Sequence, residues 1–185
     1  MIAPPRFFEI GARTNFSFLE GASHPEEMVQ AAVALARQGE LAGLGIADRN
    51  TVAGVVRAHA QLRDMPDDAG LKVQPGARLV FADQTPDMLA FPCNRAGWGK
   101  LCRLLSAGNL RSDKGHCTLF VDDLLEWGDE MMLAVLPGRP LLDDRAAGDA
   151  FAANLHRFRA RFGNRMHLAL SADYDGRDSL AFASF

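Results

Sequence analysis

An α/β fold built around a parallel sheet is the fold class that this sequence predicts. Short apolar segments alternate along the chain with segments whose apolar residues recur at helical spacing. Residues 41–48, LAGLGIAD, form an almost wholly apolar run that is typical of a strand covered on both faces. Of the 185 residues, 48% are hydrophobic, which is enough for one sizeable core. We therefore expect right-handed βαβ units within a single domain that spans residues 1–185.

The expected elements follow from these patterns in chain order. Strands are expected over residues 7–11, 41–48, 71–81, 87–93, 131–137 and 165–172. Helices are expected over residues 23–39, 52–63, 94–110, 121–127, 146–162 and 178–185. Ser23 can cap the first helix, with Glu26 three residues later completing a capping box. In the third strand region, Pro75 and the glycine after it predict an internal break.

The chain stops soon after the sixth expected strand. A closed barrel of βα units needs further units, so we expect an incomplete barrel whose C-terminal strands are missing from this chain. If the chain were a remnant with no role of its own, its open sheet edges would favour self-association.

Composition limits the classes of partner. A formal net charge of -3 argues against a surface that coats nucleic acid, although it leaves room for a local basic patch. Cys93, Cys102 and Cys117 are odd in number and form no Cys-x-x-Cys pair, so reduced thiols in the cytoplasm are expected. We find no signal peptide and no apolar run near the ~20 residues of a membrane span, so no membrane partner is expected.

Polar residues at the expected strand ends are the candidates for a site, because sites in parallel α/β folds gather there. These ends offer Asp48 and Asp87 as carboxylates, but also Arg13, Arg49 and Arg78. A guanidinium group is always protonated and only donates hydrogen bonds, so it cannot bind a metal. Dinucleotide-binding glycine motifs, P-loops and nucleophile elbows are absent from the sequence. We therefore predict no metal, no other cofactor and no catalytic residue.

Four segments, in this order, resemble a known family: TNFSFLEGASHPEEMVQAA, GIADRNTVAGVVRAH, PGARLVF and NRAGWGKLCRLLS, the last followed by KG. Together they resemble the N-terminal PHP (polymerase and histidinol phosphatase) domain of bacterial family C DNA polymerases, in particular the error-prone, damage-inducible branch. The resemblance implies a distorted (β/α)7 barrel, incomplete in this chain, followed by the catalytic domains of a longer polymerase.

The resemblance also implies which positions correspond to a metal site. Active PHP domains carry His-x-His, Asp-His, Gly-x-Glu and a further histidine at successive strands, and a last Asp-x-His motif falls beyond Phe185. The positions of this chain that match these ligands are Gly11, Arg13, Asp48, Arg49, Arg78 and Asp87. One or two aspartates facing three arginines cannot hold a multi-metal site, which needs several imidazoles and bridging carboxylates. The resemblance thus implies a degenerate metal site without phosphoesterase or exonuclease activity.

Ion pairs are the expected replacement for the metals. We hypothesise that the three arginines pair with Asp48, with Asp87 and Glu9 as further partners. Because the three cations outnumber the two strand-end aspartates, Arg13, Arg49 and Arg78 are candidate anion-binding residues. The alternative is that one or more of these arginines points into solvent.

Two functions are compatible with these observations. The first is a non-catalytic structural and interaction domain of an error-prone translesion DNA polymerase that acts in DNA damage repair. Its partners would be the rest of the polymerase chain, DNA and accessory mutagenesis proteins. The alternative is a free-standing PHP-type metal-dependent phosphoesterase, against which the ligand losses count.

Overall fold

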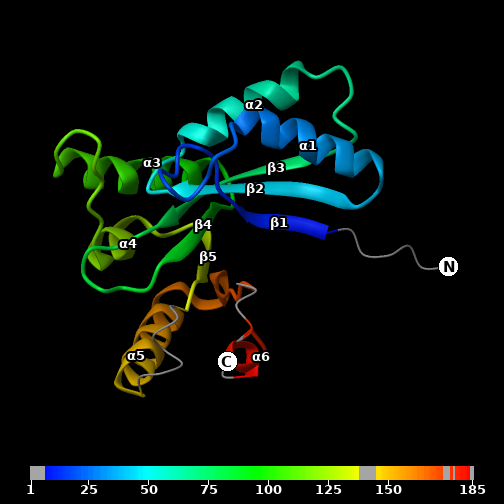
Figure 1. Cartoon of the computed structure of the whole chain (residues 1–185). Coiled ribbons are helices and arrows are strands. Elements are labelled where there is room, and N and C mark those ends of the chain that lie inside the picture. Colours follow the sequence, from blue (N-terminus) through cyan, green and yellow to red (C-terminus); the bar gives the residue numbers. More distant parts are fainter. Residues whose placement is uncertain (1–6, 138–144, 173–175, 177, 184–185) are drawn as a thin grey trace. The chain divides into compact units, whose positions relative to one another are not determined.

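The computed structural model describes residues 7–137, 145–172, 176 and 178–183. Its six strands follow one another in the order β1-β2-β3-β4-β5-β6. The strands are β1 (Phe7–Ala12), β2 (Leu41–Arg49), β3 (Lys72–Leu79), β4 (Met88–Pro92), β5 (Met131–Val135) and β6 (Met166–Leu168). The helices are α1 (Pro25–Arg37), α2 (Ala53–Asp64), α3 (Arg95–Leu110), α4 (Val121–Trp127), α5 (Arg145–Phe162) and α6 (Asp178–Ala183), and a 3-10 turn, η2 (Gly163–Arg165), precedes β6. The predicted α/β class is confirmed (Figure 1).

The chain divides into two compact units. The first holds residues 1–79 and 90–92, and the second holds residues 80–89 and 93–185. β4 therefore contributes its last residues to the first unit and its first residues to the second. Among the described residues, no helix is long and apolar enough to cross a membrane.

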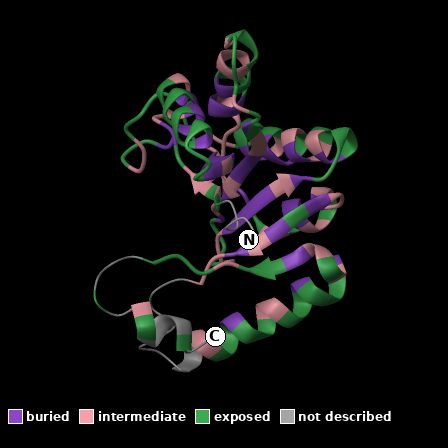
Figure 2. Ribbon diagram, turned by 90° about the vertical axis from the view of Figure 1, so that its right-hand side faces the viewer, coloured by how far each residue is buried: buried purple, intermediate pink, exposed green. Residues whose placement is uncertain are grey.

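In the first unit, β1, β2 and β3 are parallel, and α1 and α2 lie side by side over one face of these strands (Figure 1). The central strand β2 is buried along most of its length, as its apolar sequence predicts (Figure 2). Gly43 of β2 pairs with Phe8 of β1, and a Cβ at this glycine would collide with the Phe8 ring. The glycine thus lets the aromatic side chain of Phe8 lie close against the middle strand.

The start of α1 differs by one residue from the expectation. His24, not Ser23, is the N-cap residue, and its backbone amide donates to the carboxylate of Glu27 at 2.8 Å. Pro25 occupies the first helical position, where its missing N–H costs nothing because that amide has no intrahelical partner. The proline therefore fixes the boundary, and Glu27 rather than Glu26 closes the capping box.

The break expected inside the third strand is wrong. β3 runs through Pro75 and Gly76 without interruption, and both residues keep their parallel register with Ile46 and Ala47 of β2. A Cβ at Gly76 would collide with the ring of Phe91 in β4. The glycine serves close packing between neighbouring strands and does not end one.

The second unit pairs β5 with β6 in parallel and packs α3 against α4. Asn94 caps α3 by accepting the Gly97 amide at 2.9 Å. The core of the second unit includes apolar side chains that are almost fully buried, among them Leu101, Leu104, Leu119, Leu124, Met131, Leu133 and Phe158.

Candidate functional site

The carboxylate of Asp48, near the end of β2, is fully buried and anchors the loop that follows β1. It accepts the backbone amide of Thr14 at 2.7 Å, the Thr14 hydroxyl at 2.8 Å and the Ser17 hydroxyl at 2.7 Å. Ser17 in turn accepts the amide of Arg49 at 3.0 Å. Thr14 and Ser17 are themselves fully buried, so a chain of hydrogen bonds joins the loop to the C-terminal end of β2.

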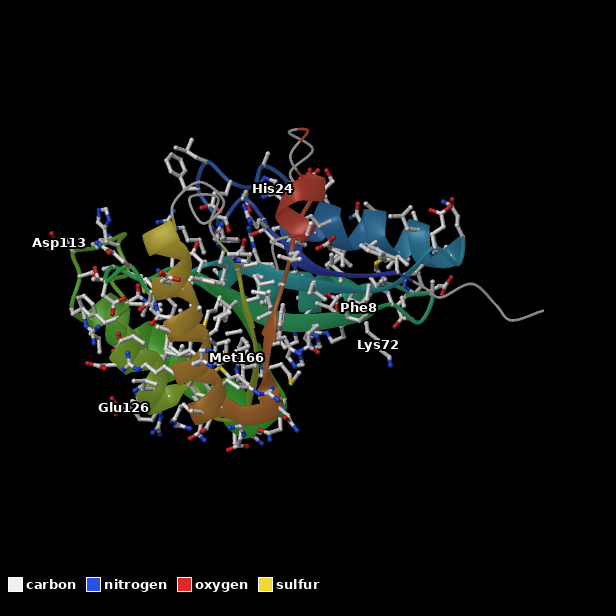
Figure 3. The ribbon with its side chains drawn as sticks, turned by 90° about the horizontal axis from the view of Figure 1, so that it is seen from below. Phe8, His24, Lys72, Asp113, Glu126 and Met166 are labelled. Carbon is white, nitrogen blue, oxygen red and sulfur yellow. The ribbon has the colours of Figure 1, made fainter. Side chains whose placement is uncertain are left out.

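The anchored loop, residues 13–24, is a tight structure. The amides of Glu20 and Gly21 both donate to the Ser17 carbonyl, at 2.9 and 3.0 Å, and the Asn15 amide donates to the Ser23 carbonyl at 2.9 Å. A Cβ at Gly21 would meet the backbone of Thr14, so the loop closes on itself where a larger residue has no room. Figure 3 places His24 at the end of this loop, away from Phe8 and Lys72 at the other end of their strands.

Glu20 is brought by this loop into contact with three guanidinium groups. Nη1 of Arg78 lies 2.7 Å from Oε2, Nη1 of Arg13 lies 3.1 Å from the same oxygen, and Nη1 of Arg49 lies 3.2 Å from Oε1. We call these four residues the arginine cluster. Arg13 and Arg49 come from the ends of β1 and β2, and Arg78 from β3. The three strand ends thus meet around one carboxylate.

Burial within the cluster is graded. The side chains of Arg78 and Glu20 are 19% and 20% exposed, whereas those of Arg13 and Arg49 are 41% and 53% exposed. The shortest and most shielded ion pair is therefore Arg78 with Glu20. Arg13 and Arg49 lie around this pair with more of their surface in water.

The carboxylate that pairs with the arginines is not the one expected. Asp48 gives both oxygens to Thr14 and Ser17, so the expected pairing of the guanidinium groups with Asp48 is wrong. Glu9 accepts the Gly11 amide at 2.6 Å. Asp48 is fully buried, below the more exposed guanidinium groups. Its carboxylate could approach them only by giving up its hydrogen bonds to the loop. Asp87 belongs to the second unit, where its carbonyl accepts the Leu136 amide at 2.8 Å.

Sequence reasoning missed Glu20 because it lies in a loop and not at a strand end. A signal was available in retrospect: Glu20 is followed by Gly21, which permits the close turn that aims the carboxylate back at the strands. The roles of Thr14 and Ser17 were also missed, because a hydroxyl side chain in a loop is usually an ordinary turn residue.

The donor set at these strand ends does not suit a metal ion. Gly11 has no side chain to offer, the guanidinium groups cannot coordinate, and the lone pairs of Asp48 are engaged by three donors. In the described ranges, no group of three or more His, Cys, Asp or Glu side chains is arranged to hold a metal. What the arrangement can do chemically is donate hydrogen bonds to an anion.

The fold agrees with that of a known class. The chain superposes on a crystal structure from Bifidobacterium adolescentis, provisionally named a metal-dependent phosphoesterase, with a TM-score of 0.53 and 17% identity, over 82% of this chain and 75% of that one. This likeness concerns the fold alone, which is the α/β fold of PHP type that the sequence predicted. No family model matches the chain.

Sequence similarity shows which proteins the chain is related to. The chain is 55% identical over 183 residues to error-prone DNA polymerase 1 of Rhizobium meliloti strain 1021, which covers 99% of this chain. It is 50% identical over 175 residues to an error-prone DNA polymerase of Mesorhizobium japonicum. The chain spans 15% and 14% of the length of these two curated relatives. It is therefore homologous to one segment of bacterial error-prone DNA polymerases, as its motifs predicted.

Proposed function

We propose that this chain is a non-catalytic structural and interaction domain of an error-prone DNA polymerase, with a PHP metal site that has been replaced by ion pairs. The observation that carries the proposal is the arginine cluster. Arg13, Arg49 and Arg78 stand at three strand ends that correspond to metal-ligand positions of active PHP domains, and all three contact Glu20. A carboxylate held by guanidinium groups keeps the strand ends together, which is a structural role that a bridging metal fills elsewhere.

Homology to error-prone polymerases supports the wider setting of the proposal. The parent enzyme would copy damaged templates during DNA repair in the cytoplasm. The partners of this domain would be the rest of the polymerase, the DNA and accessory mutagenesis proteins. The domain itself would contribute stability and contacts, with no phosphoesterase chemistry and no polymerisation of its own.

Metal content and hydrolysis test the proposal against the phosphoesterase that the shared fold suggests. The protein is purified with added manganese or zinc, dialysed, and assayed by elemental analysis and with p-nitrophenyl phosphate and a thymidine p-nitrophenyl phosphodiester. We expect less than stoichiometric metal and no turnover above the protein-free rate. Stoichiometric metal, with turnover that a chelator abolishes and added metal restores, would establish the phosphoesterase instead.

A further inference from the structure

Helix α3 of the second unit differs from the other helices in charge. Of the α-helices that the structure describes, only α3 has no aspartate or glutamate in its sequence, although the whole chain carries a formal net charge of -3. Its Lys100 pairs with Glu130 at 3.0 Å. Within the described ranges, Arg95 and Arg103 have no carboxylate partner. The helix thus presents two guanidinium groups whose charge no described side chain neutralises.

Helix α4, which packs against α3, receives an arginine at each of its ends (Figure 1). Arg111 lies 5.2 Å from the centroid of the Phe120 ring, and Asp123 occupies its fork through hydrogen bonds of 2.6 and 2.7 Å. Arg103 lies 5.3 Å from the centroid of the Trp127 ring, but no described carboxylate occupies its fork. Contact with the indole holds the guanidinium plane, so its N–H groups are oriented for a carboxylate of another molecule.

The exposed face of α3 departs from local helix preferences at three positions. Arg95 occupies the first helical position, where the helix dipole disfavours a cation. Gly99 weakens the helix relative to alanine, and a Cβ there would meet nothing within 4 Å, so no packing contact requires the glycine. Leu110 is 88% exposed. Because a helix turns by about 100° per residue, these three residues and Arg103 fall within about 80° of one another around the axis. Departures from local preference that gather on one face indicate a binding surface.

The spacing along this face matches that of a second helix. Arg95 and Arg103 are about 12 Å apart along the axis, and Leu110 lies about 10.5 Å further on, so each interval is about two helical turns. A helix lying on this face presents its own side chains at nearly the same interval, because residues seven apart share a face. At Gly99 no side chain keeps its backbone away. The face therefore fits an amphipathic helix with two carboxylates two turns apart and apolar residues beside them.

Charge decides which helix the face can accept. Two copies of α3 packed face to face would bring four guanidinium groups together without a carboxylate between them, which is repulsive. An acidic helix removes this repulsion, and its carboxylates can pair bidentately with the guanidinium forks. The exposed leucine and the open glycine also favour a helix over a phosphate backbone, which gains little from either.

We propose that the exposed face of α3, formed by Arg95, Gly99, Arg103 and Leu110, is a docking site for an acidic amphipathic helix of a partner protein. Carboxylates of that helix would pair with the two arginines, and its apolar side chains would cover the glycine and the leucine. The inference goes beyond the proposed function, because this face belongs to the second unit and its role does not depend on whether ion pairs have replaced a metal site.

Fluorescence anisotropy with labelled peptides of about 21 residues, long enough to span the face, tests the docking site. One alanine-based helical peptide carries two glutamates seven residues apart with leucines on the same face, and its matched control carries glutamines instead. Wild type is compared with Arg95→Gln combined with Arg103→Gln, and with Gly99→Leu. A control variant, Arg37→Gln with Arg63→Gln, removes the same charge from exposed arginines of the first unit. Urea unfolding verifies that each variant is folded.

We expect wild type to bind the glutamate peptide at least about fivefold more tightly than the glutamine peptide at low salt, because two ion pairs add to the affinity. The variant without Arg95 and Arg103 should lose this preference, and the control variant should keep it. Gly99→Leu should weaken both peptides at least about fivefold, because its side chain blocks the approach of the helix. In amide NMR spectra of wild type, the glutamate peptide should shift residues 95–110 and leave residues 41–49 unchanged.

Four results would overturn the inference. The first is no binding of either peptide at concentrations up to about 1 mM. The second is an equal affinity for the two peptides, or an equal loss in the arginine pair and its control. The third is displacement of the peptide by a lower concentration of oligothymidine that shifts the same amides, which would make this a phosphate-binding face. The fourth is dimerisation through residues 95–110, measured by sedimentation. None of these results bears on the metal assay, so the two proposals fail separately.

Discussion

The carboxylate of Asp48 binds Thr14 twice, accepting its backbone amide at 2.7 Å and its hydroxyl at 2.8 Å. Together with the Ser17 hydroxyl, these contacts fix the loop from which Glu20 reaches the arginines. In this structure the carboxylate of Asp48 acts as the anchor of a loop. Its effect on the arginine cluster is therefore indirect, through the conformation of residues 14–20.

Replacing Asp48 by alanine should destabilise the protein severely. The substitution leaves three buried donors without an acceptor, and each unsatisfied donor costs about 1–3 kcal/mol. We therefore expect the free energy of unfolding to fall by at least about 3 kcal/mol. Urea unfolding measures this loss, with Asp113→Ala at an exposed position as the control. A loss below about 1 kcal/mol would mean that the carboxylate does not hold the loop.

Alanine at Gly54 should be harmful although alanine favours helices. A Cβ there would collide with Asp48 Oδ2 and would lie 2.8 Å from Thr14 Oγ1. We expect a loss of about 1–3 kcal/mol from overpacking of this hydrogen-bonded corner. Gly99 in α3 is the matched control, because its Cβ would meet nothing within 4 Å. Gly99→Ala should gain up to about 1 kcal/mol in the same unfolding assay, and equal effects at both glycines would contradict this account.

Arg111 and Asp123 form an ion pair in the second unit whose carboxylate is almost fully buried. Two parallel contacts join them, Nη1 to Oδ2 at 2.6 Å and Nη2 to Oδ1 at 2.7 Å, and the Asp123 side chain is 8% exposed. Removing the guanidinium by Arg111→Ala leaves a buried carboxylate, so we expect a loss of about 3 kcal/mol. Arg63→Ala, which breaks an exposed pair with Asp64, should change stability by less than about 1 kcal/mol. Similar losses for the two variants would show that burial of Asp123 is unimportant.

Stability at acid pH should depend on Asp129. Hydrogen bonds from Arg161, at 2.8 and 3.1 Å, hold the pKa of this carboxyl below its ordinary value, with help from the charges of Lys100 and Arg165. A lowered folded-state pKa means that the contribution is complete above the unfolded pKa of about 4 and is lost as the pH falls through the folded pKa.

Unfolding midpoints between pH 7 and pH 3 measure this contribution. Wild type should exceed Asp129→Asn at pH 7, and the gap should narrow below about pH 4. The midpoint of Arg161→Gln should also lie below that of wild type at pH 7, and this difference should also narrow below about pH 4. The reason is that the substitution removes the donors that lower the pKa of Asp129. A gap that stays constant down to pH 3 would exclude the pair as the source.

The strands and helices were predictable because each is a local pattern. The apolar run of β2 and the helical spacing of α1 each predict their element without information from the rest of the chain. The rule that sites gather at strand ends predicted that Arg13, Arg49 and Arg78 lie together, as they do. Glu20 was not predictable in this way. Its position depends on the hydrogen bond that the Ser17 hydroxyl donates to Asp48, which lies far away in the sequence. No spacing rule describes such a contact.

The two local errors have different physical origins. Pro75 and Gly76 are breakers by propensity, but a strand between two neighbours tolerates them where a ring from β4 fills the space above the glycine. At α1, the proline outweighed the better capping side chain of Ser23 and moved the boundary to His24. Local propensity gives the element, and the surrounding structure decides its details.

Glu20→Gln should make the first unit sensitive to salt. The substitution keeps the size of the side chain but removes the negative charge that Arg13, Arg49 and Arg78 all contact, so the repulsion among these guanidinium groups would increase. We expect a loss of about 1–2 kcal/mol at 20 mM salt, which is larger than for a single exposed pair because three contacts are lost together.

The loss should shrink as salt is added, because ions screen the repulsion. Sulfate or phosphate should restore more stability than chloride at equal ionic strength, because a divalent oxyanion can take the place of the carboxylate. Unfolding of the variant and of wild type is compared in the three salts, with Glu40→Gln as an exposed control. A variant whose stability equals that of wild type at low salt would show that the cluster is not held by Glu20.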